Sequence, residues 1–242
     1  MYSANPSILA RQLGVAGILS KFKPRRLITR GGTRVRGAYP SVRFPWELPW
    51  ETPQERRLIR VAELSQSILE LRTQHVTLNI PGANGGVFSY TPDATAIVRN
   101  PTTGLRSGVV IECKPFDLAN LDDNIVKHAQ IRQVLAKLNI PFVVLTEEEL
   151  PDSLDANLNL VLRHTRFHRH PEAHRELEAT VAQGEFPRFG DLANAVGTAN
   201  ALHVLASGWL YFNHFEALTI QSALSNQPKE TWDAARHIYL GR

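Results

Sequence analysis

Apolar residues between positions 52 and 71 recur at the spacing of a helix. Leu58, Val61 and Leu69 belong to this stripe, and three- and four-residue steps place such residues on one helical face. Thr52, followed by Pro53 and Glu55, has the composition of an N-cap, a first turn and a capping box. The pattern predicts a helix from Thr52 to about Leu71.

Shorter apolar runs that alternate or are fully hydrophobic follow this helix. They predict strands at 75–80, 87–90, 93–99, 107–114 and 141–145, with turns at PGANGG and at 100–104. A second helical stripe covers about 123–138. Helix, strands, helix and strand in this order predict an α/β fold, with a restriction-endonuclease-like core in which helices flank a small mixed sheet.

The segment after residue 188 has the pattern of a small winged-helix-like domain. Helices are expected at 189–195 and from Thr198, as cap, to about Ser207, where Gly208 ends the second one. Wing strands are expected at 209–212 and 218–222. The second helix has no Arg or Lys, which would be unusual for a recognition helix that contacts base edges in DNA. A protein-binding role is therefore an equal alternative.

Composition divides the 242 residues into four regions. They are a basic arm (1–46), a nuclease-like α/β domain (47–150), a basic His- and Arg-rich linker (151–188) and the winged-helix-like domain (189–242). No apolar run approaches the roughly 18 residues of a membrane span, and no secretory signal is expected. Cys113 is the single cysteine, so no intrachain disulfide forms, as in a cytoplasmic protein.

Positive charge is concentrated in the basic arm. The net charge of the chain is only +4, but residues 1–46 contain nine Lys or Arg and no acidic residue. Such an arm suits DNA phosphates, and the alternative is a solvated tail. The candidate DNA-binding residues are Lys21, Lys23, Arg25, Arg26, Arg30, Arg34, Arg36 and Arg43. Trp46 and Trp50 are expected to pack beneath the arm rather than to stack on bases.

Two charged residues interrupt the apolar strand SGVVIECKPF. Alternation places Glu112 and Lys114 on one face and Cys113 on the other, while Asp93, across the hairpin, is expected beside Glu112. Two converging carboxylates repel unless a cation lies between them, and Mg²⁺ prefers such oxygen ligands. With Lys114 beside it, this set suits phosphodiester hydrolysis. The alternative is a cross-strand ion pair on a solvated face.

Three other groups have two interpretations each. Glu55 either joins the metal site or serves only in the capping box, and Glu51 is its neighbouring competitor. The four histidines in RHTRFHRHPEAHRE could bind a transition metal, but the interleaved arginines favour contact with phosphate or a partner; they are His164, His168, His170 and His174. Cys113 as a nucleophile is disfavoured, because it lies on the face opposite Glu112.

These motifs together resemble the PD-(D/E)xK nucleases and, more particularly, TnsA, the endonuclease subunit of Tns-type DNA transposons. The matching stretches are Tyr39-Pro40-Ser41, LPWETPQE (48–55), Tyr90-Thr91-Pro92-Asp93 and Ile111-Glu112-Cys113-Lys114-Pro115. The family often has Ser where this chain has Thr52, and both residues can cap a helix.

The resemblance implies a role for each matching residue. Asp93, Glu112, Glu55 and the carbonyl of Cys113 would hold Mg²⁺, with Mn²⁺ as a substitute, and the catalytic set would be Glu55, Asp93, Glu112 and Lys114. The protein would cut the non-transferred strand of double-stranded DNA beside a DDE transposase (TnsB-like) and an AAA+ ATPase (TnsC-like). It would be bacterial or phage-encoded, cytoplasmic and DNA-associated.

Two other functions remain open at this stage. One is a free-standing nuclease of the same fold in restriction, repair or phage metabolism. The other is a non-catalytic DNA- or protein-binding adaptor on the same fold, which would lack magnesium-dependent nicking.

Overall fold

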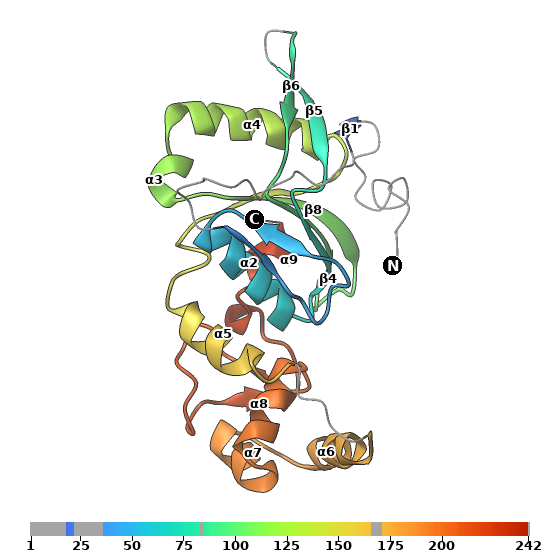
Figure 1. The fold of residues 1–242 in the computed structure, drawn as a ribbon, viewed down its shortest axis with the longest axis vertical. Helices are drawn as coiled ribbons and strands as arrows, with labels where there is room; N and C mark the ends of the chain where they lie inside the picture. Colours follow the sequence, from blue (N-terminus) through green and yellow to red (C-terminus); the bar gives the residue numbers. More distant parts are fainter. Residues whose placement is uncertain (1–17, 22–35, 83–84, 166–170, 242) are drawn as a thin grey trace.

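A four-stranded mixed sheet lies at the centre of the protein, whose computed structural model describes residues 18–21, 36–82, 85–165 and 171–241 (Figure 1). In sheet order, the strands are β4 (Ile68–Thr73), β7 (Ala94–Arg99), β8 (Arg106–Cys113) and β9 (Phe142–Leu145). The pairs β4–β7 and β7–β8 are antiparallel, and β8–β9 is parallel. The predicted mixed sheet is therefore confirmed.

Helices cover both faces of this sheet. Helices α2 (Pro53–Leu64) and α9 (Arg236–Leu240) belong to the core on one face, and α4 (Asp122–Ala136) lies on the other. Strand alternation in β8 separates the two cores, since Val109 and Ile111 lie in the first and Val110 in the second. Among the described residues, no helix combines the length and apolar character needed to cross a bilayer.

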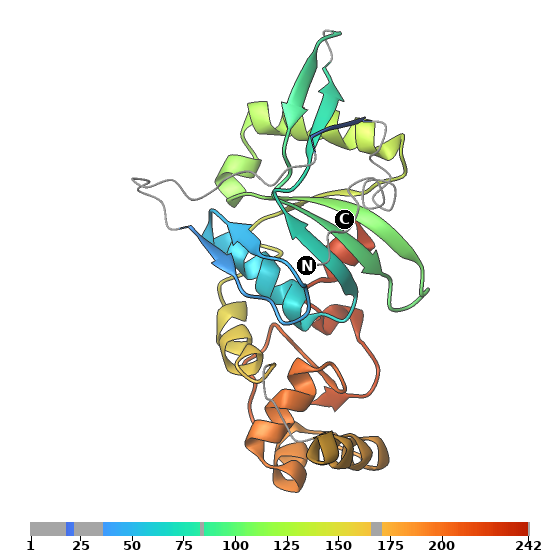
Figure 2. The ribbon, with the colours of Figure 1, turned by 45° about the vertical axis from the view of Figure 1, so that its right-hand side comes forward.

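A smaller sheet projects from the same end of the molecule as α4 (Figures 1 and 2). It contains β1 (Leu19–Lys21), β5 (Thr77–Pro81) and β6 (Val87–Tyr90) in the order β1–β5–β6. A separate pair joins β2 (Gly37–Tyr39) to β3 (Leu48–Trp50). The described parts of the predicted basic arm, at 18–21 and from 36 onward, thus contribute strands to the fold.

The helix predicted to run to about Leu71 ends at Leu64, and the prediction was wrong over its last two turns. Ser65 is extended, and the chain continues as β4. Arg43 explains this end: its guanidinium donates hydrogen bonds to the carbonyls of Ala62 at 2.7 Å and Ser65 at 2.5 Å. A distant side chain therefore satisfies carbonyls that the end of the helix leaves unpaired.

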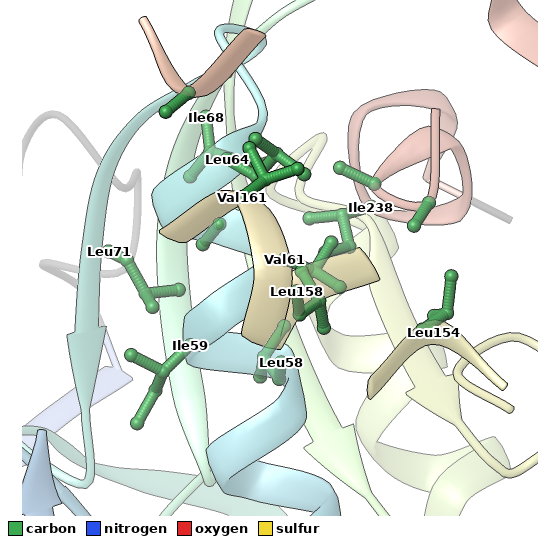
Figure 3. Close-up of a cluster of buried hydrophobic side chains, with 14 of the residues drawn as sticks. Leu58, Ile59, Val61, Leu64, Ile68, Leu71, Leu154, Leu158, Val161 and Ile238 are labelled. Carbon is green, nitrogen blue, oxygen red and sulfur yellow. The ribbon is translucent and has the colours of Figure 1, made fainter. Parts of the chain in front are cut away.

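Residues 151–188, predicted as a linker, contain α5 (Leu154–Leu162) and α6 (Pro171–Gln183). Helix α5 packs on α2 and contributes Leu158 and Val161 to the core (Figure 3). Asp155 joins the two helices, accepting from Arg57 at 2.9 Å and from Arg60 at 2.8 Å. This part of the predicted linker is a packed element of the fold.

The C-terminal part contains α7 (Phe189–Val196), α8 (Thr198–Ala206), β10 (Tyr211–Phe212) and β11 (Leu224–Ser225). The bounds of the two helices match the predictions closely, but Thr198 as cap was wrong, because Gly197 precedes α8 as its N-cap and no side chain caps the helix. The first wing strand covers only the second half of the predicted 209–212. The second predicted wing strand, at 218–222, is wrong: Thr219 and Ser222 form a turn through Ser222 N–H to the Thr219 carbonyl at 3.0 Å. The strand lies two residues later and pairs with β10.

After a short 3₁₀ turn, η2 (Glu230–Trp232), the chain returns to the central sheet. Helix α9 contacts β7, β8 and β9, and Ile238 is fully buried beside Val61 and Leu158 (Figure 3). The last helix therefore completes the core of the central sheet, and the described residues from 189 to 241 do not form a unit that packs only on itself.

This return predicts that the sheet depends on the C-terminal helix. Ile238→Ala should lower the free energy of unfolding by about 2–4 kcal/mol, because it removes buried methyl groups and leaves a cavity. Urea unfolding measures the effect. The matched control is Ile220→Ala, since Ile220 is 66% exposed and its loss should change stability by less than about 0.5 kcal/mol. Equal effects at the two positions would contradict the packing described.

Candidate active site

Asp93 and Glu112 meet where β7 begins and β8 ends. Ala94 pairs with Ile111 across these antiparallel strands, so Asp93, one residue earlier, lies next to Glu112. The Asp93 Oδ2 atom accepts a hydrogen bond of 2.8 Å from the backbone N–H of Cys113. The backbone of β8 therefore holds the Asp93 carboxylate beside the Glu-Cys-Lys segment, as the strand pattern predicted.

Both carboxylate oxygens of Glu112 have partners. Oε2 accepts from the Tyr90 hydroxyl at 2.7 Å, and Oε1 accepts from Lys114 Nζ at 3.2 Å. Glu112 is only 6% exposed, whereas the Lys114 side chain is 24% exposed. This is not an ion pair on a solvated face, because the acid is buried and the lysine side chain is only partly exposed.

Glu55 lies in the first turn of α2 and takes part in its cap. The Glu55 N–H donates to Thr52 Oγ1 at 3.2 Å, and Oε2 accepts from the Glu51 N–H at 2.9 Å. Thr52 therefore caps α2 as predicted, while the Glu55 carboxylate reaches the N–H of Glu51 instead of that of the cap residue. Glu55 is also only 4% exposed, and repulsion between its carboxylate and that of Asp93 raises the pKa of Asp93. The helix cap and the candidate site therefore share this residue.

Two glutamines connect the start of α2 to the strands of the site. Gln74 donates from Nε2 to Glu55 Oε2 at 3.2 Å, and its backbone N–H donates to the Asp93 carbonyl at 3.0 Å. Gln54 Nε2 donates at 2.9 Å to the Leu145 carbonyl, which also accepts from the Lys114 N–H at 3.0 Å. Helix α2 is thereby fixed to the strand ends that carry the acids.

Burial and like charge make the ionised acids unfavourable. Burial, followed by repulsion from Glu112 and Glu55, raises the pKa of Asp93 to about 8. Burial also raises the pKa of Glu55 above its ordinary value. Tyr90 responds in the same direction: burial and the neighbouring Glu112 raise the pKa of its phenol. The site is thus a cluster of buried acids whose ionised forms a cation would stabilise.

The donor chemistry of this cluster fits a hard divalent cation. Carboxylate and amide oxygens are the ligands that Mg²⁺ prefers, and buried Gln74 has an Oε1 atom with no hydrogen-bond partner among the described residues. The spacing is less favourable: across the described ranges, no three or more His, Cys, Asp or Glu side chains are grouped closely enough to hold one ion. Asp93 and Glu112 are the two residues on which a metal site would depend.

Cys113 lies on the opposite face of β8 from Glu112, as predicted, and belongs to the core beneath the sheet. Burial, followed by repulsion from Asp93, raises the pKa of its thiol well above the ordinary value, so the thiolate nucleophile is disfavoured. Its N–H bonds to Asp93. The role of its carbonyl as a metal ligand stays a prediction.

The predicted DNA-binding residues lie mainly outside the described residues: Lys23, Arg25, Arg26, Arg30 and Arg34. Lys21 belongs to β1, and Arg36 is half-buried. Arg43 serves the fold, because its guanidinium donates to the carbonyls that end α2 and, at 2.6 Å, to that of Ile68. These contacts disfavour Arg43 as a phosphate ligand.

Trp46 and Trp50 pack against the fold. Trp46 Nε1 donates to the Leu71 carbonyl at 2.7 Å, and Arg72 lies over its ring at 3.7 Å. The edge of Trp50 lies so close to Gly37 that a Cβ there would meet its ring at 2.8 Å. Both rings therefore support the β2–β3 segment, as expected.

The histidine-rich segment is described only in part, since His168 and His170 lie outside the described residues. The His174 ring lies 5.1 Å from the Trp209 ring and 5.9 Å from the His203 ring. His203 Nδ1 is 2.9 Å from the His164 carbonyl. In the described part, these histidines pack α6 against α8, and their contact with phosphate or a partner stays a prediction.

Sequence reasoning missed Tyr90, Gln74 and Gln54. Tyr90 and Gln54 lie within stretches that carry the family resemblance. Tyr90 precedes Asp93 by three residues and Gln54 directly precedes Glu55, so both positions offered a usable signal. Gln74 gave no such signal, because the apolar stripe continues at helical spacing to Leu71 and hides the strand that ends just before Gln74. Its backbone, with φ of 47°, turns sharply there.

Comparison with protein-family models and with curated proteins finds no match to this chain. The arguments for a function therefore come from the site itself and from its motifs.

The raised pKa predicts that Asp93 destabilises the metal-free protein. An unfolded Asp has a pKa of about 3.9, whereas that of folded Asp93 is about 8. Between these values the folded state binds more protons than the unfolded state, so wild-type stability falls as the pH rises. Asp93→Asn should be more stable than wild type near pH 8 in EDTA, on the order of 2 kcal/mol.

Urea unfolding at about pH 5 and about pH 8 tests this, with the difference between variant and wild type growing towards the higher pH. Exposed Glu185 provides the control Glu185→Gln, which should show no such growth. An Asp93→Asn protein that is less stable than wild type at the higher pH would contradict the electrostatic interpretation.

Proposed function

We propose that this protein is a Mg²⁺-dependent DNA endonuclease that hydrolyses a phosphodiester bond. The observation that carries the proposal is the convergence of Asp93, Glu112 and Lys114 at the adjoining ends of β7 and β8. A buried acid pair beside an ammonium group is an arrangement suited to metal-assisted hydrolysis.

Each residue has a role in this proposal. Asp93 and Glu112 would hold the ion, Glu55 would assist, and Tyr90 would orient Glu112 through its hydroxyl. Lys114 would position the attacking water and offset charge on the phosphate. When bound, Mg²⁺ supplies a Lewis acid that offsets negative charge on the scissile phosphate.

The motif set favours a TnsA-like role with a restriction-endonuclease-like core. In this proposal the protein cuts the non-transferred strand at transposon ends, together with a DDE transposase and an AAA+ ATPase. The basic residues of 1–46 other than Arg43 would neutralise DNA phosphates. The order α7, α8, β10 and β11 supports a winged-helix-like domain, and the absence of Lys and Arg from α8 (Thr198–Ala206) favours a protein partner for it.

A second candidate is a non-catalytic adaptor on the same fold. The favouring observation is that Tyr90, Lys114, Glu51, Thr52 and Gln74 already engage the oxygens of Glu112 and Glu55. A metal would have to share these oxygens with the donors or displace some of the hydrogen bonds. Magnesium-dependent nicking separates the two candidates.

The nuclease proposal predicts that Asp93→Ala and Lys114→Ala each lower Mg²⁺-dependent nicking of supercoiled plasmid by at least about 100-fold. Wild type should nick with Mg²⁺ or Mn²⁺ and not in EDTA. The assay is run alone and with any transposase and ATPase subunits encoded beside the protein. Circular dichroism and thermal melting verify the fold of each variant.

The matched control is Lys137→Ala, since Lys137 is an exposed lysine just beyond α4. The nicking activity of this variant should equal that of wild type. Full cutting by both site variants would refute the catalytic assignment. No cutting by wild type with its partners present would favour the adaptor.

A further inference from the structure

An apolar surface lies immediately beyond the candidate site. The five side chains that form it, here called the 116–126 surface, are Phe116, Leu118, Leu121, Ile125 and Val126, each between 44% and 57% exposed. They belong to α3 (Phe116–Ala119), the following turn and the start of α4. Several exposed apolar side chains in one segment mark an interaction site more often than isolated ones do.

A groove deepens this surface. A cavity of about 270 Å³ opens between Phe116 and Ile125 on one side and Val144 of β9 on the other. His128, 5% exposed, lines it, and its Nε2 atom has no hydrogen-bond partner among the described residues. Phe116, Ala119, Ile125 and Val144 give the groove an apolar part for an anchoring side chain, and the rest of its lining is polar.

The groove is held in place by the backbone. The Phe116 N–H donates to Glu147 Oε2 at 2.8 Å, and the Asn120 and Asn124 side chains donate to carbonyls of Phe116 and Leu118 at 2.9 and 2.7 Å. A surface that is already ordered loses little conformational entropy when it binds a partner.

Negative charge surrounds the surface, although the whole chain has a net charge of +4. The exposed acids on α3, the start of α4 and the turn after β9 are Asp117, Asp122, Asp123, Glu147 and Glu148. Arg132 is a cation that also lines the groove, and its guanidinium lies over the Phe142 ring at 5.7 Å. The rim is therefore mainly acidic around an apolar centre.

We propose that the 116–126 surface binds a basic amphipathic helix of a partner protein. Apolar residues of such a helix would fill the groove, and its Lys or Arg residues would face the acidic rim. Duplex DNA fits poorly, because its phosphates would meet the acids. A second copy also fits poorly, because a two-fold interface brings the same patch together with itself and opposes the two acidic rims.

Phe116 lies two residues beyond Lys114 in the sequence, so a bound partner would lie next to the candidate site. The docking proposal does not rest on the nuclease function, and its test uses neither DNA cleavage nor a divalent cation.

The test uses a fluorescein-labelled synthetic peptide of Leu and Lys, with Leu at helical spacing on one face, and the full chain in EDTA. Fluorescence anisotropy should show binding that weakens with salt. The double variant Leu121→Ser/Ile125→Ser should bind about tenfold more weakly or worse, and Glu148→Lys should also weaken binding. The matched control Ile220→Ser alters an exposed Ile outside the surface and should bind as wild type does.

A second peptide, with Glu in place of every Lys, tests the charge argument and should bind at least about tenfold more weakly. Equal binding of the two peptides, or unchanged binding by the double variant with its fold intact, would overturn the proposal. Two further measurements use the same double variant. If the variant loses affinity for duplex DNA but retains peptide binding, the surface binds DNA instead. If wild type is a dimer in sedimentation and the variant is a monomer, the surface binds a second copy instead.

Discussion

Mutual repulsion among buried carboxylates is the constraint that organises the candidate site. Asp93, Glu112 and Glu55 lie close enough for their charges to oppose one another, and burial removes the water that would screen them. Specific donors hold the acids in place. The Cys113 N–H fixes Asp93, Tyr90 and Lys114 fix Glu112, and the start of α2 fixes Glu55.

The surrounding fold makes this concentration of charge tolerable. Core residues fill both faces of the central sheet, and α9 returns from the C-terminal part to complete the core beneath β7 and β8. Stability gained there offsets the electrostatic destabilisation at the strand ends, a relation that is common at functional sites. The C-terminal part therefore supports the site through packing.

Strand alternation made the centre of the site predictable. The period of two predicted Glu112 and Lys114 on the same side of the chain, which holds although β8 ends at Cys113, and the hairpin length brought Asp93 next to them. Local patterns failed where distant residues decide the structure. The helical stripe continued past Leu64, but Arg43 satisfies the carbonyls at the helix end, and β4 pairs with β7 instead. Gln74 was missed for the same reason, since its position depends on the end of β4.

Direct observation of a cation between the two strands tests the central claim most sharply. A crystal of the full chain, soaked in Mn²⁺ and measured at the manganese absorption edge, reveals the ion independently of any activity. The account predicts anomalous density bounded by the Asp93 and Glu112 carboxylates. Saturating Mn²⁺ with no density there, or with density only at other acidic residues, would contradict it.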